Sequence, residues 1–338
     1  MSSNTDTEFA ALRTNCGLTS LTWRSRFLLT GPDRGRWCNG IVTNNIRDLA
    51  PGHGVYAFFL SPQGRILADL YCYNRGDDLL IETDAAQAAG LRAAWDKYII
   101  MDEVEIQDAP PATTLGLVGP HAAEVLRTAL AAPGEDFSKL PPLVMRAVSW
   151  QGANSIIIRD DNEAVSGFEI WLPTAGAAEF WQALTVAGAT PVGFEALELL
   201  RIWSHRPRYG VDISDRYLPQ ETAQQRALNF NKGCYVGQEI VERIHSRGLV
   251  HRVFAALAVE GDPPESGAKI LSGDKEVGEV TSAARIPALA TEPARTIALG
   301  YVRREALASP NASEALRIGE ARASGLGSAA EELAGTRK

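Results

Sequence analysis

The sequence predicts an α+β fold, with two α+β halves followed by a small carboxy-terminal β-barrel. The first 110 residues alternate strand-like and helix-like patterns, and a second cycle of this kind begins near residue 114. Short apolar runs separated by Gly, Pro and Asp then fill residues 253–303. A chain of 338 residues has room for two or three domains. We expect one region over residues 1–248, divided near 110, and a barrel over 249–323.

The first half contains an apolar run at 27–29 that stops at Gly31-Pro32, and a helical stretch at 34–39. Strand patterns follow at 55–60, 65–73 and 77–82. The first two of these strands are joined by Ser61-Pro62-Gln63-Gly64, which has the composition of a hairpin turn. Residues 84–99 are predicted to form a helix, because Leu91, Trp95 and Tyr98 fall on one face.

The second half begins in the same way, with an apolar run at 115–118, Gly119-Pro120 and a helical stretch at 121–131. A proline suits the first turn of a helix, where its missing N–H costs nothing. The likeness favours two halves of related build, but two ordinary strand–helix joints would give the same pattern. Strands at 155–158 and 168–171 and helices at 177–187 and 194–201 complete this half.

The last part of the chain has short strand patterns at 256–259, 269–271, 277–281 and 297–302. Ser272-Gly273-Asp274 is predicted to be a turn. Residues 324–338 carry few large apolar side chains, so we expect a disordered tail there.

Composition excludes several classes of function. The formal charge is −8, so the chain is a poor non-specific binder of nucleic acid or of membrane surfaces. We see no signal peptide and no run of 18 apolar residues. The four cysteines lie far apart and are expected to be reduced thiols in a cytoplasmic protein. Phosphate-loop, nucleotide-fold and zinc motifs are absent, so we expect no resident metal.

The segment around Cys234 carries the sharpest chemical signal. Gly233 and Gly237 give its backbone unusual freedom, and a helix is predicted from Gln238 to a stop at Gly248. A helix amino terminus and the nearby Lys232 both favour a thiolate over a thiol. Cys234 is therefore a candidate reactive cysteine, although a small buried apolar residue is the other reading.

Charge is also unevenly distributed. Residues 201–252 hold nine Lys or Arg and five Asp or Glu, a local excess of four positive charges in an acidic chain. This excess suits an anionic ligand such as a carboxylate or phosphate tail, or a set of structural ion pairs.

These residues together resemble a known family. The segment KGCYVGQE at 232–239, preceded by LPQE and followed by ERIHSRGLVHR, is similar to the hallmark of the YgfZ family of folate-binding proteins. That family is related to aminomethyltransferase, the T-protein of the glycine cleavage system. Further similarity lies in LTGPDRGRWCNGIVTNNIRDL, FFLSPQGRILADLYCY, SGFEIWLP, ELLRIWSHRPRYGVDI and IALGYVRRE, so it spans about residues 15–305.

The resemblance implies a T-protein-like fold, in which two intertwined α+β halves surround a central folate cavity. It places Glu169 and Arg201 at the pteridine ring of tetrahydrofolate. A carboxylate can accept two N–H bonds from the edge of a 2-amino-4-oxo-pteridine. Asp69, which follows Ala68 where T-proteins have an acidic pair, is assigned to the cavity and to catalysis. Lys232, Tyr235 and Cys234 are placed at one mouth, with Lys232 and Tyr235 contacting folate and Lys232 and Cys234 in catalysis.

The functional implication is tetrahydrofolate-dependent support of iron–sulfur protein assembly or repair. Transient partners would be assembly proteins or client enzymes. The chain lacks the four-cysteine set of a stable cluster, so Cys234 would act on a transferred group or lend one thiolate. Two alternatives stay open: a folate-dependent one-carbon transferase, and a folate-binding module without turnover.

Overall fold

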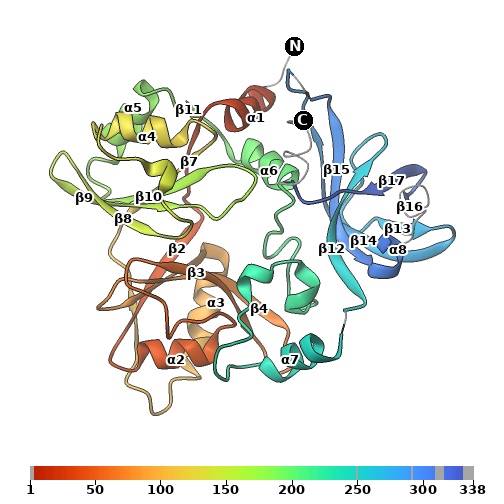
Figure 1. Cartoon of the computed structure of the whole chain (residues 1–338), viewed down its shortest axis with the longest axis horizontal. Coiled ribbons are helices and arrows are strands. Elements are labelled where there is room, and N and C mark those ends of the chain that lie inside the picture. Colours follow the sequence, from red (N-terminus) through yellow and green to blue (C-terminus); the bar gives the residue numbers. More distant parts are fainter. Residues whose placement is uncertain (1–3, 249, 291, 309–315, 330–338) are drawn as a thin grey trace.

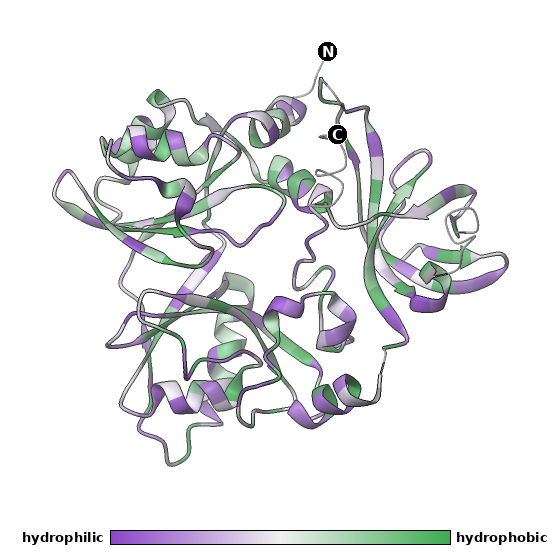
Figure 2. Ribbon diagram, in the orientation of Figure 1, coloured by the Kyte–Doolittle hydropathy of each residue, from purple (hydrophilic) through white to green (hydrophobic). Residues whose placement is uncertain are grey.

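The computed structural model describes residues 4–248, 250–290, 292–308 and 316–329. It contains two open β-sheets and one closed β-barrel. The sheets lie one above the other on the left of Figure 1, and the barrel lies on the right. Hydrophobic residues occur in the strands and also in the helices (Figure 2). No helix in the described ranges has the length and apolar character needed to cross a membrane.

The first sheet has five strands in the order β3-β4-β5-β2-β6, and all neighbours are antiparallel. Its helices cover one face, where Trp95 packs edge-on against Phe27 of the sheet and against Trp37 in a common core. The elements are β2 (Arg24–Thr30), α2 (Arg34–Ile41), β3 (Gly54–Leu60), β4 (Ile66–Asn74), β5 (Leu79–Asp84), α3 (Ala85–Asp96) and β6 (Glu105–Asp108).

The second sheet has six strands in the order β11-β1-β7-β10-β9-β8. Helices α4 and α5 pack on it around Phe168 and Phe180, while α1 packs against α6 beside it. The elements are α1 (Asn4–Thr14), β1 (Gly17–Ser20), β7 (Thr113–Val118), α4 (Ala122–Ala129), η1 (Phe137–Lys139), β8 (Met145–Trp150), β9 (Ala153–Arg159), β10 (Gly167–Leu172), α5 (Ala177–Val186), β11 (Thr190–Pro191) and α6 (Phe194–Trp203).

The two halves exchange strands. The order β3-β4-β5-β2 in the first sheet has its counterpart in β8-β9-β10-β7 in the second. Next to β7 lies β1, from the start of the chain, and next to β2 lies β6, which directly precedes β7 in sequence. Each half therefore completes the sheet of the other, which confirms the expectation of two intertwined halves.

The Gly-Pro joints repeat the same local geometry. Gly31 and Gly119 have φ values of 95° and 140°, and a Cβ on either would collide with a backbone carbonyl, that of Glu103 or Asn15. The residue two positions later donates its N–H to that carbonyl, at 3.3 Å from Asp33 and 3.0 Å from His121. The similarity of the two halves thus extends from sequence to structure.

The carboxy-terminal barrel is closed, in the order β12-β15-β14-β13-β16-β17. The last strand extends beyond the expected end of the barrel, because Ser324 still pairs with Ala258. Residues 330–338 of the expected tail lie outside the described residues. The segment before the barrel contains η2 (Pro219–Thr222), η3 (Gln225–Ala227) and α7 (Gln238–Arg247). The barrel strands are β12 (Arg252–Val259), β13 (Lys269–Ser272), β14 (Lys275–Ile286), β15 (Arg295–Arg303), β16 (Leu316–Ile318) and β17 (Ala321–Gly325), and α8 (Arg304–Ala308) follows β15.

The start of α7 rests on the hairpin turn between β3 and β4. Gly237 has φ of 80°, and a Cβ there would lie 2.5 Å from the carbonyl oxygen of Ser61. We expect Gly237→Ala to lower the free energy of unfolding by about 2 kcal/mol or more, from left-handed strain plus this collision. The matched control is Gly76→Ala, since Gly76 has φ of 94° and open space around it. Equal losses in urea unfolding for the two variants would contradict the role of the close contact.

Candidate functional site

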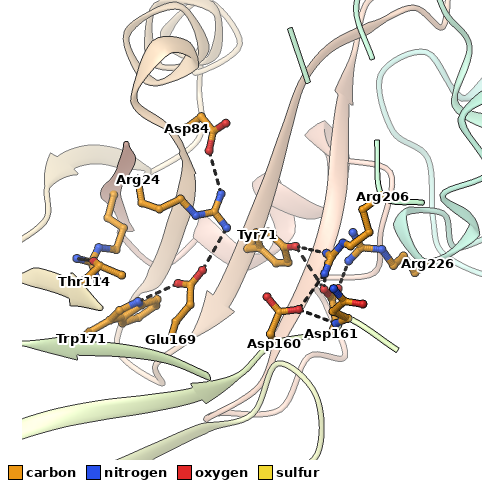
Figure 3. Close-up of polar contacts among 12 residues, drawn as sticks. Arg24, Tyr71, Asp84, Thr114, Asp160, Asp161, Glu169, Trp171, Arg206 and Arg226 are labelled. Carbon is orange, nitrogen blue, oxygen red and sulfur yellow. Dashed lines mark hydrogen bonds and ion pairs between the residues drawn. The ribbon is translucent and has the colours of Figure 1, made fainter. Parts of the chain in front are cut away.

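A cavity of about 590 Å³ lies between the two sheets and is lined on one side by α6 and the segment that follows it. The first sheet contributes Arg24, Asp69 and Tyr71 to its wall, and the second contributes Glu169. Figure 3 shows the side chains of two polar clusters at this junction. The predicted residues Glu169, Arg201 and Asp69 all line this one cavity.

Glu169 reaches the cavity because residues alternate between faces along β10. Phe168 and Ile170 point into the core of the second half, and Glu169 points the other way. Its carboxylate lies 3.4 Å from Nη2 of Arg24 and accepts the indole N–H of Trp171 at 3.3 Å (Figure 3). Only 12% of the side chain is exposed. Glu169 is therefore a hydrogen-bond acceptor with a fixed position at the inner wall of the cavity, and its cationic partner is Arg24.

A second carboxyl group, that of Glu82, lies beside this pair. It stands opposite Arg26 in the β2–β5 ladder and is 0% exposed. Neither of its oxygens has a hydrogen-bond partner among the described residues. Burial, and then the charge of Glu169, raise the pKa of Glu82 to about 8. Sequence reasoning missed this residue, because alternation along β5 does not distinguish a buried glutamate from an exposed one.

Arg201 lines the cavity but is held elsewhere. Its guanidinium donates at 2.6 Å to Asp212 and at 2.9 Å to Ser282 of the barrel, and it also contacts Glu198. These contacts tie α6 to β14. The resemblance places Arg201 with Glu169 at the pteridine ring, and both line the cavity. The cation beside Glu169 is Arg24, whereas Arg201 joins two parts of the fold.

Asp69 presents its carboxylate at the cavity wall, and each of its oxygens accepts one hydrogen bond. Oδ1 accepts a bond from Gln87 at 2.8 Å, and Oδ2 accepts one from the hydroxyl of Tyr56 at 2.8 Å. Burial, followed by the charge of Asp69, raises the pKa of Tyr56 well above its ordinary value. The tyrosine therefore stays a donor, and the Asp69 side chain is held in place by hydrogen bonds from Tyr56 and Gln87.

Several of the positive side chains in residues 201–252 are paired with carboxylates of this chain. Arg206 bonds Asp160 and Asp161 at 2.8 Å each, and Arg226 also contacts Asp161 (Figure 3). Further ion pairs hold Arg208 to Glu198 and Arg252 to Glu221. Of the two readings of this excess, the structure supports structural ion pairs at these positions.

Cys234 is exposed, whereas Cys16, Cys38 and Cys72 are buried. The reading of Cys234 as a buried apolar residue is therefore wrong. The helix after it begins at Gln238 and ends before Gly248, as predicted. Burial raises the pKa of Cys16 to about 12, so this thiol stays protonated at neutral pH.

Lys232 does not serve Cys234 as predicted. Its ammonium donates to the carbonyls of Asn39 and Val42 at 2.5 Å each and of Asn44 at 2.8 Å, at the carboxyl end of α2. Burial lowers the pKa of this amine to about 8. Lys232 thus links the loop that carries Cys234 to the end of α2. Its three described hydrogen bonds all go to backbone oxygens.

Tyr235 is buried beneath the same loop and belongs to a core with Tyr56 and Tyr71. Its backbone N–H bonds the side chain of Gln238 at 2.8 Å. The residues that line the cavity include neither Tyr235, Lys232 nor Cys234. The structure brings Glu169, Asp69 and Arg201 together and leaves the Cys234 loop outside their cavity.

Comparison with known proteins gives the family. Residues 1–232 match the family model described as the GCVT N-terminal domain. The chain belongs to this family. Residues 252–325 match the model of the CAF17 C-terminal beta-barrel domain. The two matches make the chain a YgfZ- or CAF17-like relative of aminomethyltransferase.

Curated relatives agree with this placement. The chain is 30% identical over 310 residues to an aminomethyltransferase of Streptomyces coelicolor, covering 87% of this chain and 80% of that protein. An aminomethyltransferase of Desulforamulus reducens is 28% identical over 300 residues, with the same coverage. The crystal structure of glycine cleavage system aminomethyltransferase T from Bartonella henselae superposes with a TM-score of 0.83 at 22% identity, covering 96% of this chain and 89% of that one. The last similarity confirms the T-protein-like fold.

The part of the chain that the structure describes contains no candidate metal-binding cluster. No group of three or more His, Cys, Asp or Glu side chains there is arranged to hold a metal ion. Within those ranges, only Cys234 among the four thiols reaches the surface.

Proposed function

We propose that this protein binds tetrahydrofolate in the central cavity and supports the assembly or repair of iron–sulfur proteins in the cytoplasm, with Cys234 as its working thiol. The observation that carries the folate part is Glu169, a held carboxylate on the inner wall of a cavity of about 590 Å³. Cavities of a few hundred Å³ with a few polar groups are typical of cofactor sites.

The residues present fit a pterin. Glu169 keeps lone pairs free beyond its contacts with Arg24 and Trp171, so it can accept N–H donors from a ring edge. Towards the outside, Phe194 is 48% exposed and packs edge-on against Trp23, which offers an apolar surface to an aryl group. Tetrahydrofolate would supply a one-carbon-carrying amine when bound. The residues of this chain would orient it and shield it from water.

The cavity and the thiol loop share a chain of hydrogen bonds. Lys232 donates to the carbonyl of Asn44, whose side-chain amide donates to the carbonyls of Tyr56 and Arg226 at 2.8 Å each. Tyr56 in turn bonds Asp69 in the cavity wall. A ligand that moves Tyr56 or Arg226 would therefore act on the loop that carries Cys234.

The second candidate function is one-carbon transfer from an aminomethyl donor to tetrahydrofolate. The aminomethyltransferase names of the relatives favour it, as does Asp69, a carboxylate at the cavity wall. Each oxygen of Asp69 accepts one hydrogen bond, from Gln87 or from Tyr56, and keeps a further acceptor site free, as the oxygens of Glu169 do. Formation of methylene-tetrahydrofolate from an aminomethylated amine, lost in Asp69→Asn, would establish this function instead.

Replacement of Glu169 tests the folate site. We expect Glu169→Gln to weaken binding of 5-formyltetrahydrofolate by about 10- to 150-fold, because hydrogen bonds to a charged group contribute about 1.5–3 kcal/mol. Calorimetric titration measures the effect, and Glu179→Gln on the exposed face of α5 is the matched control. Equal affinity of Glu169→Gln and wild type would remove the cavity assignment, and failure of the wild type to bind would remove folate binding itself.

A further inference from the structure

Glu82 is the buried ionisable group that the proposed function does not use. It lies in β5 with Arg26 of β2 opposite on one side and Tyr71 of β4 opposite on the other. Its side chain is wholly inaccessible, and it lies within electrostatic reach of Glu169, Arg24, Arg26 and Tyr73. A lone carboxylate in such a place is costly unless it is paired or carries a proton.

The neighbouring cations are engaged elsewhere. Arg24 directs one nitrogen to Asp84 at 3.2 Å and another to Glu169 at 3.4 Å. Arg26 donates to the hydroxyl of Thr114 at 2.6 Å, and its guanidinium lies 4.6 Å from the ring centroid of Trp171. Within the described ranges, Glu82 therefore has charged neighbours but no donor on either oxygen. Glu82 can avoid the cost of an unpaired buried charge if it is protonated and donates a hydrogen bond to the carboxylate of Glu169.

We propose that Glu82 and Glu169 hold one proton between them, with Glu82 as the acid and Glu169 as the anion that faces the cavity. This inference rests on the proposed function and refines it. When Glu169 accepts a hydrogen bond from protonated Glu82, it stays ionised and presents only hydrogen-bond acceptor sites to the cavity. The site then selects a planar heterocycle with two neighbouring N–H groups on one edge, as in a 2-amino-4-oxo-pteridine. Glu82 acts through Glu169 and is a positioning residue.

The shared proton also links binding to pH. Loss of the proton leaves two adjacent carboxylates, which are tolerated only while water reaches Glu169. A bound ligand excludes that water, so it disfavours the doubly ionised pair and raises the pKa at which the proton leaves. Between neutral pH and about 8, the pKa of Glu82 in the free protein, affinity then changes little with pH. Above that value it falls by up to about tenfold per pH unit, because binding must take up a proton.

The first arm of the test needs no ligand. Infrared spectra of the wild type at neutral pH should contain the carbonyl stretch of a protonated carboxylic acid, and that band should disappear with a midpoint near pH 8. Glu82→Gln should lack the band. Glu221→Gln is the control, because Glu221 is also buried but is paired with Arg252, and that variant should keep the band. A wild type without the band, or a Glu82→Gln variant that retains it, would overturn the proposal.

The second arm measures proton uptake. 5-Formyltetrahydrofolate is titrated above pH 8 in two buffers that differ in ionisation enthalpy. The wild type should take up close to one proton per ligand, whereas Glu82→Gln, whose amide can still donate to Glu169, should take up none and should bind at neutral pH within about threefold of wild type. Uptake by Glu82→Gln would overturn the assignment. A wild type that shows the infrared band but binds no folate would remove the proposed function and leave the shared proton standing.

Discussion

Asp212→Ala should lower the free energy of unfolding by about 3–5 kcal/mol, the cost of leaving a buried charge without its partner. Asp212 is 0% exposed and accepts from Arg201 at 2.6 Å and from Ser282 at 2.7 Å. It also accepts from Thr281 and from the backbone N–H of Arg208. Without this carboxylate, hydrogen-bond donors on α6, on the following loop and on β14 lose the acceptor that they share.

Two further variants separate the charge from the packing. Asp212→Asn keeps an acceptor oxygen for Ser282 and should lose less than Asp212→Ala in urea unfolding. Asp136→Ala removes an exposed carboxylate that pairs with Lys139 and accepts from Ser138, and we expect a smaller loss there because both groups stay in water. A loss for Asp212→Ala no larger than that for Asp136→Ala would show that this junction does not hold the barrel against α6.

Much of the fold could be predicted because hydrophobic periodicity is a local property. Strands such as β3 and β10, and the start of α7 after Gly237, lie where alternation and helix-stop residues place them. The helix α1 was not predicted, because its sequence is polar apart from a few residues. It is ordered by tertiary contacts, since Phe9 and Leu12 are buried in a core with α6. The strand exchange of β1 and β6 is likewise a long-range pairing that no local pattern encodes.

The candidate site could be predicted only in part, for the same reason. Glu169 and Asp69 were located through motifs, and both line the cavity. The partners of Arg201 come from the loop after α6 and from the barrel, so its role depended on the tertiary fold. Proximity in sequence also predicted that Lys232 would favour the thiolate of Cys234, because the two residues are two positions apart. In the structure the long side chain of Lys232 instead donates to backbone carbonyls at the end of α2. A lysine that is buried seeks acceptors, and a helix carboxyl end supplies them.

Replacement of Cys234 has the largest expected effect on function. In a strain from which the gene is deleted, we expect Cys234→Ala to restore none of the lost activity of several iron–sulfur enzymes. Cys234 is the exposed thiol, whereas Cys16, Cys38 and Cys72 are buried among apolar side chains, and thiolate chemistry requires access to the reacting group. Cys234→Ser should also fail, because a serine hydroxyl cannot replace a thiolate nucleophile or a sulfur ligand.

The control is Cys16→Ala, which removes a sulfur atom from the core and should complement, with protein levels compared by immunoblot. Stability cannot account for a failure of Cys234→Ala, because an exposed side chain contributes little to the core. Full rescue by Cys234→Ala together with failure of Glu169→Gln would separate the two halves of the proposal. Iron–sulfur support would then depend on the folate cavity alone, and the exposed sulfur would have no part in it.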